Sequence, residues 1–313
     1  MRSVEVDGFR SSVIGLGTWQ FGSREWGYGE AYASETAPAL VRRAVELGIT
    51  MLDTAEAYGP GRSERIVGSA FAALDRDARD GLTVATKFLP LVPAEPIVAR
   101  QAAGSRRRLG VETLDLYYAH WPNPLVSVRR TMQALRPLVA SGVVRRVGVS
   151  NYDVARWQDA ERALRVPVVA NQVRFSLASP APAGDLVPYA AAMDRLVVAY
   201  SPLAQGLLAD GLEETAGRHR GMRAANPLFR SAARHRLIPL AAALHEIAAA
   251  HGATPAQVAL AWVIHHPNTV AIPGARTVAQ LEENAAAAEL ELADDEIDRL
   301  AVLAEAFAQR PVR

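Results

Sequence analysis

The sequence contains no cysteine among its 313 residues, which excludes disulfide bonds, thiolate metal sites and a cysteine nucleophile together. An excess of charge is also missing, because 34 basic and 33 acidic residues leave a formal net charge of +1. A chain with so little net charge has no bulk attraction to nucleic acid or to an anionic membrane. We therefore expect neither of them as a partner.

Long apolar runs are missing as well. None approaches the roughly 20 residues that are needed to span a bilayer. The first segment, MRSVEVDGFRSSVIGLG, carries charges at Arg2, Glu5, Asp7 and Arg10, so it lacks the apolar core of a signal peptide. These absences predict a soluble, cytoplasmic protein.

Short apolar runs alternate along the chain with stretches of helical spacing. The start predicts a hairpin turned at Asp7-Gly8 and then a first strand around Val13–Leu16. Seven further strands are predicted, at Thr50–Asp53, Thr83–Thr86, Leu114–Tyr118, Val144–Val149, Val168–Gln172, Leu196–Tyr200 and Thr269–Ile272.

Strands that alternate with helices pair in parallel, because each chain reversal uses a crossover helix. Eight such units predict one (β/α)8 TIM barrel, α/β in class, that spans residues 1–313 as a single domain. A doubly wound sheet is the alternative. Its G-x-G-x-x-G fingerprint is incomplete, since GLGTWQFG has the first two glycines and no helix opening after them.

Two segments depart from the simple alternation. The polar, basic stretch from Ala209 to Leu237 predicts a long loop after strand seven, of the kind that forms lids or binding loops. The segment LADDEIDRLAVLAEAF predicts an amphipathic C-terminal helix, on the outside of the barrel or across one end.

Polar side chains stand where the predicted strands end, and in such barrels the catalytic residues come from these ends. A lone lysine there is usually solvated, and a lone histidine is usually a packed core residue. Complementary side chains at the mouths of three consecutive strands instead predict an active site. They are Asp53 with Tyr58 in the loop beyond it, Lys87, and His120.

From Gly15 to about Asn284 the sequence resembles the aldo/keto reductases. The motifs GLGTW, LDTAEAYG, YYAHWPNP, GVSNY, NQV, AYSPLAQGLL and IPGARTVAQLEEN occur in this order at the element ends. The resemblance implies NADPH-dependent reduction of an aldehyde or ketone, with Asp53, Tyr58, Lys87 and His120 as the catalytic tetrad.

These residue types suit that chemistry. The alkoxide formed by hydride transfer needs a proton, and Tyr58 can give one although its ordinary pKa is about 10. We expect Lys87 to lower that pKa and Asp53 to hold Lys87 as an ion pair. His120, as a neutral donor, is expected to orient the carbonyl oxygen.

The resemblance also implies a cofactor site across the barrel mouth. Within it Ser150, Asn151 and Gln172 would hold the carboxamide, and Tyr200 would stack on one face of the nicotinamide ring. The full set of implied cofactor residues is Thr18, Trp19, Asp53, Ser150, Asn151, Gln172, Tyr200, Ser201, Leu203, Gln205, Gly274, Arg276, Gln280, Glu283 and Asn284.

Arg276 bears on the choice between NADPH and NADH. It stands just before a predicted helix start, where a guanidinium and free N–H groups would suit a 2′-phosphate. The alternative is a purely structural cap, since Thr277 and Gln280 form a T-x-x-Q capping box. We favour the phosphate site and keep both interpretations.

The substrate is expected in an aromatic pocket without a fixed cation. Its predicted contacts are Trp19, Tyr58, His120 and Trp121, joined by Trp26 or Tyr28. Arg223 and Arg230 of the long loop could still reach an acidic substrate. Asn123 departs from the aspartate common in the family, which affects the expected loop geometry rather than the tetrad.

No metal site is predicted, because the histidines lack accompanying carboxylates at ligand spacing. One other functional class shares the resemblance, since potassium-channel β subunits have this barrel and cofactor site yet act chiefly as binding partners. The small-molecule carbonyl substrate is not identified by the sequence, and a monomer and a homo-oligomer both stay open.

Overall fold

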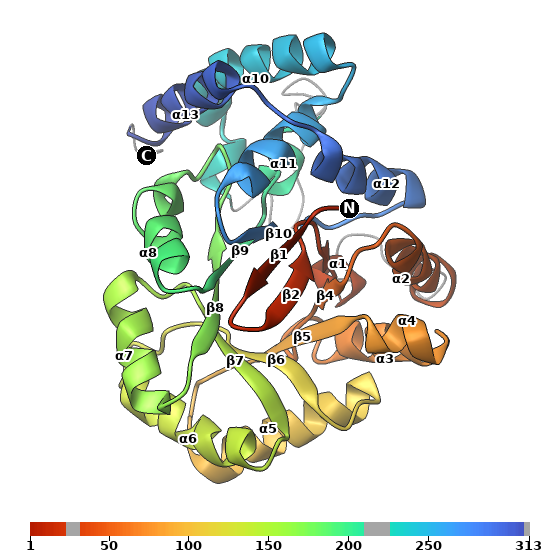
Figure 1. Ribbon diagram of the computed structural model, residues 1–313, viewed down its shortest axis with the longest axis vertical. Coiled ribbons are helices and arrows are strands. Elements are labelled where there is room, and N and C mark those ends of the chain that lie inside the picture. Colours follow the sequence, from red (N-terminus) through yellow and green to blue (C-terminus); the bar gives the residue numbers. More distant parts are fainter. Residues whose placement is uncertain (23–31, 210–225, 310–313) are drawn as a thin grey trace.

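The computed structural model describes residues 1–22, 32–209 and 226–309. Eight parallel strands form one curled sheet in the order β3 to β10, and helices lie between successive strands around it (Figure 1). The predicted (β/α)8 barrel with an N-terminal hairpin is confirmed. The strands are β1 Ser3–Val6, β2 Phe9–Ser12, β3 Leu16–Gly17, β4 Met51–Asp53, β5 Thr83–Phe88, β6 Leu114–Ala119, β7 Val144–Ser150, β8 Val168–Arg174, β9 Leu196–Tyr200 and β10 Thr269–Ala271.

The helices surround the sheet and connect its strands, as parallel pairing requires. They are α1 Trp19–Gly22, α2 Ala37–Glu46, α3 Arg62–Ala72, α4 Arg76–Asp80, α5 Glu95–Leu109, α6 Val128–Ala140, α7 Val154–Leu164, α8 Leu186–Ala192, α10 Ser231–His251, α11 Pro255–His265, α12 Val278–Ala286 and α13 Asp294–Ala308. Shorter turns are the π-helix η2 Tyr32–Thr36 and the 3₁₀ helices η3 Ala181–Ala183, η4 Ala204–Gly206, η6 Pro227–Phe229 and η7 Ala287–Glu289. In the described part of the chain, no single helix is long and apolar enough to cross a membrane. Helices α10 and α11 together reach that length and composition, but they bend by 95° at their junction.

The barrel closes where the first and last strands meet. Parallel bridges join Ile14 to Ala271 and Gly17 to Gly274, and the Gly15 amide donates to the Ala271 carbonyl at 2.8 Å. A Cβ on Gly17 would lie 2.7 Å from a backbone oxygen of β10's continuation, so this close approach requires glycine. The seam is irregular, which explains why β3 has only two residues, Leu16 and Gly17, and overlaps the predicted strand Val13–Leu16 at Leu16 alone.

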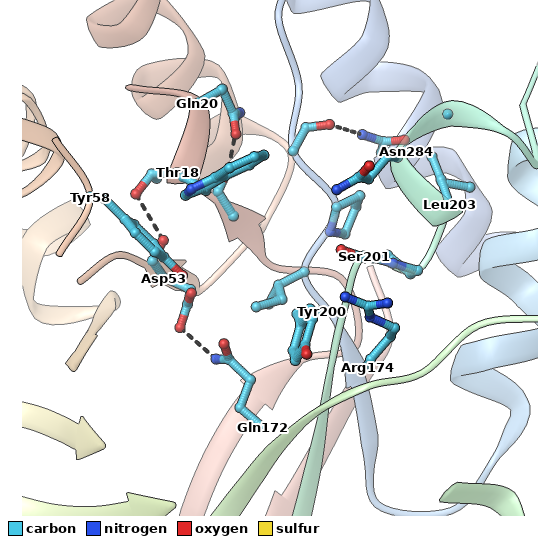
Figure 2. A pocket seen from close by; sticks show the side chains of 18 of the residues that line it. Thr18, Gln20, Asp53, Tyr58, Gln172, Arg174, Tyr200, Ser201, Leu203 and Asn284 are labelled. Atoms are coloured by element: carbon cyan, nitrogen blue, oxygen red, sulfur yellow. Dashed lines mark hydrogen bonds between the residues drawn. The ribbon is translucent and has the colours of Figure 1, made fainter. Parts of the chain in front are cut away.

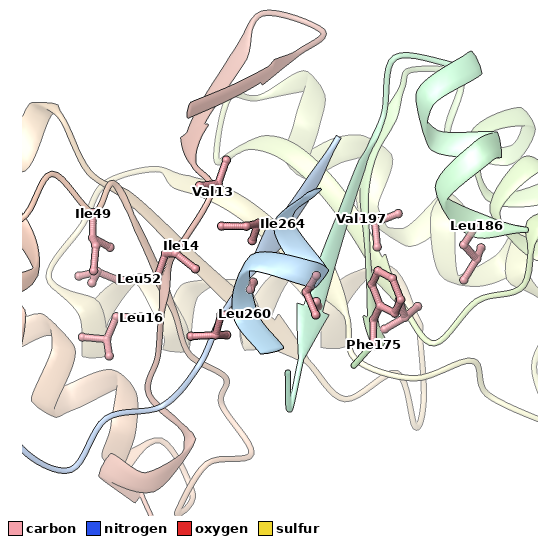
Figure 3. Close-up of a cluster of buried hydrophobic side chains, with 14 of the residues drawn as sticks. Val13, Ile14, Leu16, Ile49, Leu52, Phe175, Leu186, Val197, Leu260 and Ile264 are labelled. Carbon is pink, nitrogen blue, oxygen red and sulfur yellow. The ribbon is translucent and has the colours of Figure 1, made fainter. Parts of the chain in front are cut away.

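Two apolar layers hold the fold together. The inner one fills the barrel with residues such as Met51, Leu116 and Val198, and the hairpin β1–β2 closes its lower end with Val6 and Phe9. The outer layer lies between the strands and the helices, and Figure 3 shows the part of it near α11 and β9. Burial on both faces of the sheet is the pattern expected of parallel strands.

Two predicted boundaries differ from the structure. The predicted loop from Ala209 to Leu237 ends earlier, because α10 begins at Ser231. Ala233 and Leu237 are buried on the same helix face as Leu240 and Leu244, so apolar spacing extends the helix into the basic stretch. The short helix α1 also follows β3, where no helix was expected.

The predicted C-terminal helix is present as α13 and packs against α10 on the outside of the barrel (Figure 1). Arg299 of α13 donates to Glu246 of α10 at 2.6 Å. At the end of α10, His251 contacts Glu296 at 2.9 Å.

Candidate active site

A cavity of about 500 Å³ lies over the carboxyl ends of the strands. Every sequence-predicted cofactor residue lines it, as do Tyr58, His120 and Trp121. Figure 2 shows part of this lining, with Asp53, Tyr58 and Gln172 close together. Trp26 and Tyr28 lie outside the described residues. The strand ends therefore bring together side chains from most of the length of the chain.

Lys87, at the end of β5, stands behind the cavity wall and is fully buried. Its ammonium donates to Asp53 Oδ1 at 2.6 Å, to the Thr54 carbonyl at 2.7 Å and to the Tyr58 hydroxyl at 3.3 Å. The second Asp53 oxygen accepts from the Gln172 amide at 2.8 Å. Burial acts to lower the pKa of Lys87, but the Asp53 charge and the interactions with Asp53 and Tyr58 outweigh it and raise the pKa above its ordinary value.

Tyr58 reaches Lys87 from the loop that follows β4. Burial raises the pKa of its phenol, and the nearby Lys87 ammonium offsets this only in part. Lys87 thus acts in the expected direction, but desolvation outweighs it, so the net shift of the phenol pKa is upward. The consequence is a phenol that holds its proton at neutral pH, as a proton donor must.

His120, at the end of β6, presents an edge to the Tyr58 ring, with ring centroids 5.7 Å apart and an interplanar angle of 75°. Burial lowers the pKa of His120 to about 3, and the Lys87 charge acts in the same direction. The imidazole is therefore neutral at physiological pH. The Trp121 ring stacks on it at 5.7 Å and is 47% exposed, so Trp121 forms the outer, solvent-facing part of the cavity wall.

Amides and hydroxyls from β7, β8 and β9 form the opposite wall. The Ser150 hydroxyl donates to the Gln172 carbonyl at 2.9 Å, and the Asn151 amide donates to Ser150 Oγ at 3.0 Å. The Tyr200 hydroxyl donates to Asn151 Oδ1 at 3.0 Å, which fixes the tilt of the ring at the cavity. These hydrogen bonds connect the three strand ends within the wall.

The segment after β9 has a strained backbone. Ser201, Ala204 and Gln205 all have positive φ, which non-glycine residues adopt at a cost and which is found most often at functional sites. The Gln205 side chain accepts a hydrogen bond from Asn226 at 3.1 Å, so residues on the two sides of the undescribed segment 210–225 are joined. Ser201, Leu203 and Gln205 of this segment line the cavity.

The far end of the cavity lies at the start of α12. Thr277 caps the helix by accepting from the Gln280 amide at 3.2 Å, and the Gln280 side chain accepts from the Arg276 backbone N–H at 2.9 Å. The Thr277 half of the predicted capping box therefore exists, whereas the Gln280 side chain accepts from the backbone N–H of Arg276 instead of that of Thr277. The guanidinium is exposed and lines the cavity, so the cap and a phosphate site are compatible.

Two polar side chains of the cavity were not predicted from the sequence. Arg174 ends β8, two residues beyond Gln172 on the same side of the strand, and its guanidinium lies 5.9 Å from the Tyr200 ring centroid. Arg174 is exposed and lines the cavity beside Tyr200, so it adds a cation that sequence reasoning did not name, while the aromatic substrate pocket without a fixed cation stays a prediction. The second unpredicted side chain is Gln20. It connects β3 to the segment that follows β10, because its amide donates to the Gly17 and Ala275 carbonyls. The two-residue period of a strand was the signal that could have found Arg174.

Asn123 joins the loops after β5 and β6. Its amide nitrogen donates to the carbonyls of Pro90 at 2.6 Å and Leu91 at 3.1 Å, and its oxygen accepts from the Leu125 N–H at 2.8 Å. An aspartate has no N–H to donate, so it could not make the first two bonds.

Of the two loop arginines considered for an acidic substrate, Arg230 precedes α10 and is not among the lining residues, and Arg223 lies outside the described residues. Among the residues that the structure describes, no cluster of histidine and carboxylate side chains could hold a metal ion.

Comparisons with known proteins agree with this geometry. A model described as the aldo/keto reductase family matches residues 13–305. An uncharacterized oxidoreductase of Mycobacterium tuberculosis is 50% identical over 315 aligned residues, which cover 100% of this chain and 95% of that protein. The methylglyoxal reductase of Escherichia coli is 36% identical over 92% of this chain and 89% of its own length. The crystal structure of an aldo-keto reductase from Klebsiella pneumoniae in complex with NADPH superposes with a TM-score of 0.75 at 33% identity, covering 97% of this chain and 95% of that one.

Proposed function

This chain belongs to the aldo/keto reductase family, and from that premise we propose that it reduces an aldehyde or ketone to an alcohol with NADPH, using Tyr58 as the proton donor. One observation carries the proposal. A protonated phenol lies 3.3 Å from a buried ammonium that is itself paired with a carboxylate, at the wall of a cavity of about 500 Å³.

The donor set of the cavity suits a nicotinamide cofactor. Gln172 donates its amide N–H to Asp53, which leaves its amide oxygen as an acceptor, and Asn151 still has a second amide N–H. A primary carboxamide needs both an acceptor and a donor, and Ser150 adds a hydroxyl beside them. Tyr200 also lines the cavity, and the family resemblance implies that its ring stacks on the nicotinamide. The NADPH bound to the Klebsiella pneumoniae relative supports the same choice of cofactor.

The tetrad divides the chemistry among its members. The hydride comes from the nicotinamide ring when the cofactor is bound. His120, neutral because burial lowers the pKa of its imidazole to about 3, orients the carbonyl oxygen and stabilises the charge that builds on it. Tyr58 gives its phenolic proton to the alkoxide. Lys87 then stabilises the phenolate, and Asp53 keeps Lys87 charged and in place.

NADPH rather than NADH is proposed because of the far end of the cavity. The Arg276 guanidinium takes no part in the cap of α12 and stands beside that helix N-terminus, where a 2′-phosphate would find both a cation and free N–H groups. The bulky aromatic rim at Trp19 and Trp121 suits small aldehydes. Methylglyoxal is the first to try, since one relative is named for it, and 4-nitrobenzaldehyde is the second.

The proposal is tested by removing the proton donor. Tyr58→Phe keeps the ring and loses the hydroxyl, so kcat with either aldehyde should fall by roughly 10² to 10⁴. NADPH binding, followed by fluorescence titration, should persist because the phenol does not anchor the cofactor. Near-normal turnover by Tyr58→Phe would exclude it as the acid. Tight NADPH binding by the wild type without turnover of any carbonyl would instead favour the binding-subunit alternative.

A further inference from the structure

Glu56 lies in the loop between β4 and α3, two residues before Tyr58. Its backbone N–H donates to the Lys87 carbonyl at 3.1 Å, and its own carbonyl accepts from the Gly61 N–H at 2.7 Å. The first bond attaches the loop to the end of β5, and the second closes the turn that carries Tyr58.

The side chain of Glu56 makes a second attachment of the loop, to Leu89 just after Lys87. Its Oε1 accepts from the Leu89 N–H at 2.7 Å and from the Gln101 amide of α5 at 2.8 Å. Gln101 also donates to the Leu89 carbonyl at 3.1 Å, so the backbone of Leu89 is held in both directions.

The carboxylate of Glu56 is half-buried and accepts hydrogen bonds from two neutral donors, the Leu89 N–H and the Gln101 amide. Burial raises its pKa, Glu64 adds to this, and Arg108 opposes it. These two hydrogen bonds offset the cost of its partial burial, so the carboxylate can hold the loop to the backbone of Leu89.

We propose that Glu56 is a positioning residue, which holds the Tyr58 loop against the end of β5 so that the phenol stays in hydrogen-bond contact with Lys87. Its hydrogen bonds attach to β5 at Lys87 and just after it, because the Glu56 N–H donates to the Lys87 carbonyl and the Glu56 carboxylate accepts from the Leu89 N–H. The distance of 3.3 Å between the Tyr58 hydroxyl and Lys87 Nζ therefore depends on this attachment. The inference rests on the proposed function, in which those two atoms share the proton-donating step.

Two conservative variants of Glu56 distinguish the effect of side-chain length from the effect of charge. Glu56→Gln keeps the chain length and an acceptor oxygen but loses the charge, whereas Glu56→Asp keeps the charge and is shorter by one methylene. If the attachment matters, Glu56→Gln should retain the wild-type kcat. Glu56→Asp should lose on the order of 10- to 100-fold in kcat, because small misplacement of catalytic groups has effects of that size. The Kd for NADPH should be unchanged in both.

Asp115 provides the matched control. Its carboxylate also accepts a backbone N–H of β5, that of Val84 at 3.2 Å, and burial raises its pKa too. Val84 lies near the opposite end of the strand from Lys87. Asp115→Ala should therefore lower the melting temperature and leave kcat and the Kd for NADPH unchanged.

A second readout does not need turnover. Lys87 is the only lysine in the chain, so protein labelled with ¹⁵Nζ-lysine gives a single side-chain resonance without assignment. That resonance should shift in Glu56→Asp and stay in place in Glu56→Gln and Asp115→Ala.

The outcomes separate this inference from the function itself. Wild type without carbonyl turnover would contradict the proposed function, while the lysine resonance would still test the attachment. Glu56→Asp with wild-type kcat and an unshifted resonance would overturn the inference. An impaired Glu56→Gln beside an active Glu56→Asp would overturn it as well, because charge rather than reach would then matter.

Discussion

Lys87 is the residue on which the proposed chemistry depends most directly. It is fully buried, and the carboxylate 2.6 Å away is the group that keeps it charged. Removing one partner of such a pair leaves an uncompensated buried charge, which is far more costly than the pair itself. The pair therefore acts on both the stability of the barrel mouth and the protonation of Tyr58.

The pKa of this single lysine can be measured directly. Burial alone would lower it, and Asp53 with Tyr58 raises it above the ordinary value. The ¹⁵Nζ resonance of the wild type should therefore titrate at a pH above the ~10.4 of free lysine. In Asp53→Asn the carboxylate is gone and burial remains, so the midpoint should move to lower pH. A midpoint that rose or did not move in Asp53→Asn would contradict the ion-pair role.

Arg276 offers a second test at the scale of one residue. A hydrogen bond to a charged group contributes about 1.5–3 kcal/mol, which corresponds to roughly 10- to 100-fold in affinity. Arg276→Ala should weaken NADPH by about that factor and leave NADH nearly unchanged, because NADH has no 2′-phosphate. Fluorescence titration with both cofactors measures it. Equal losses would mean that the mutation disturbed the Thr277–Gln280 cap, and the phosphate site would be abandoned.

At the scale of elements, the loop after β4 is held by close backbone contact as well as by Glu56. A Cβ on Gly59, which has φ +59°, would lie 2.2 Å from the Gly22 carbonyl oxygen at the end of α1. The loop that carries Tyr58 therefore rests directly on the backbone of α1.

Gly59→Ala should displace that loop. The left-handed conformation alone costs an alanine about 1–2 kcal/mol, and the contact with Gly22 adds to this. Gly142→Ala is the control, because Gly142 has φ +74° with nothing within 4 Å of its Cβ position. Both variants should be less stable in urea, and only Gly59→Ala should also lose kcat. Equal kcat in the two would show that the loop can move without consequence for Tyr58.

The order and type of the elements could be predicted from sequence, and their exact limits could not. Strands buried on both faces leave clear apolar runs, so the strand ends that carry Asp53, Lys87 and His120 were found. The start of α10 was missed because basic residues such as Arg234 mask the apolar spacing of its first turns. Alternation also gave no sign of the irregular seam at Gly17, which depends on contacts with a strand more than 200 residues away.

The site residues were predictable for the same reason, with exceptions that need three dimensions. Motifs marked the residues that line the cavity, and the two-residue period of β8 could have added Arg174. The pKa of Tyr58 could not be predicted, because the competition between desolvation and the charge of Lys87 depends on how deeply the phenol is buried. The role of Glu56 was hidden too, since its partners on β5 and α5 come together only in the folded loop.

At the scale of the whole molecule, the cavity is formed by residues from both ends of the chain. Thr18 of the first strand end and Asn284 of α12 both line it. A ligand that contacts these distant segments at once binds only the folded barrel. Its binding free energy therefore adds to the free energy of unfolding.

Cofactor binding should consequently raise the melting temperature, and by different amounts for the two dinucleotides. At a concentration of 100 times its Kd, NADPH adds about 2.7 kcal/mol. With an unfolding entropy of about 2.1 cal/mol/K per residue, this is a rise of roughly 4 °C for a chain of this length. NADH at the same concentration, if bound 10- to 100-fold more weakly, should give only about 1–2 °C. In Arg276→Ala the two shifts should become nearly equal, because the guanidinium that tells the cofactors apart is gone. Calorimetric scans of both proteins with each cofactor measure this, and a wild type that NADH stabilises as much as NADPH would contradict the assignment of NADPH.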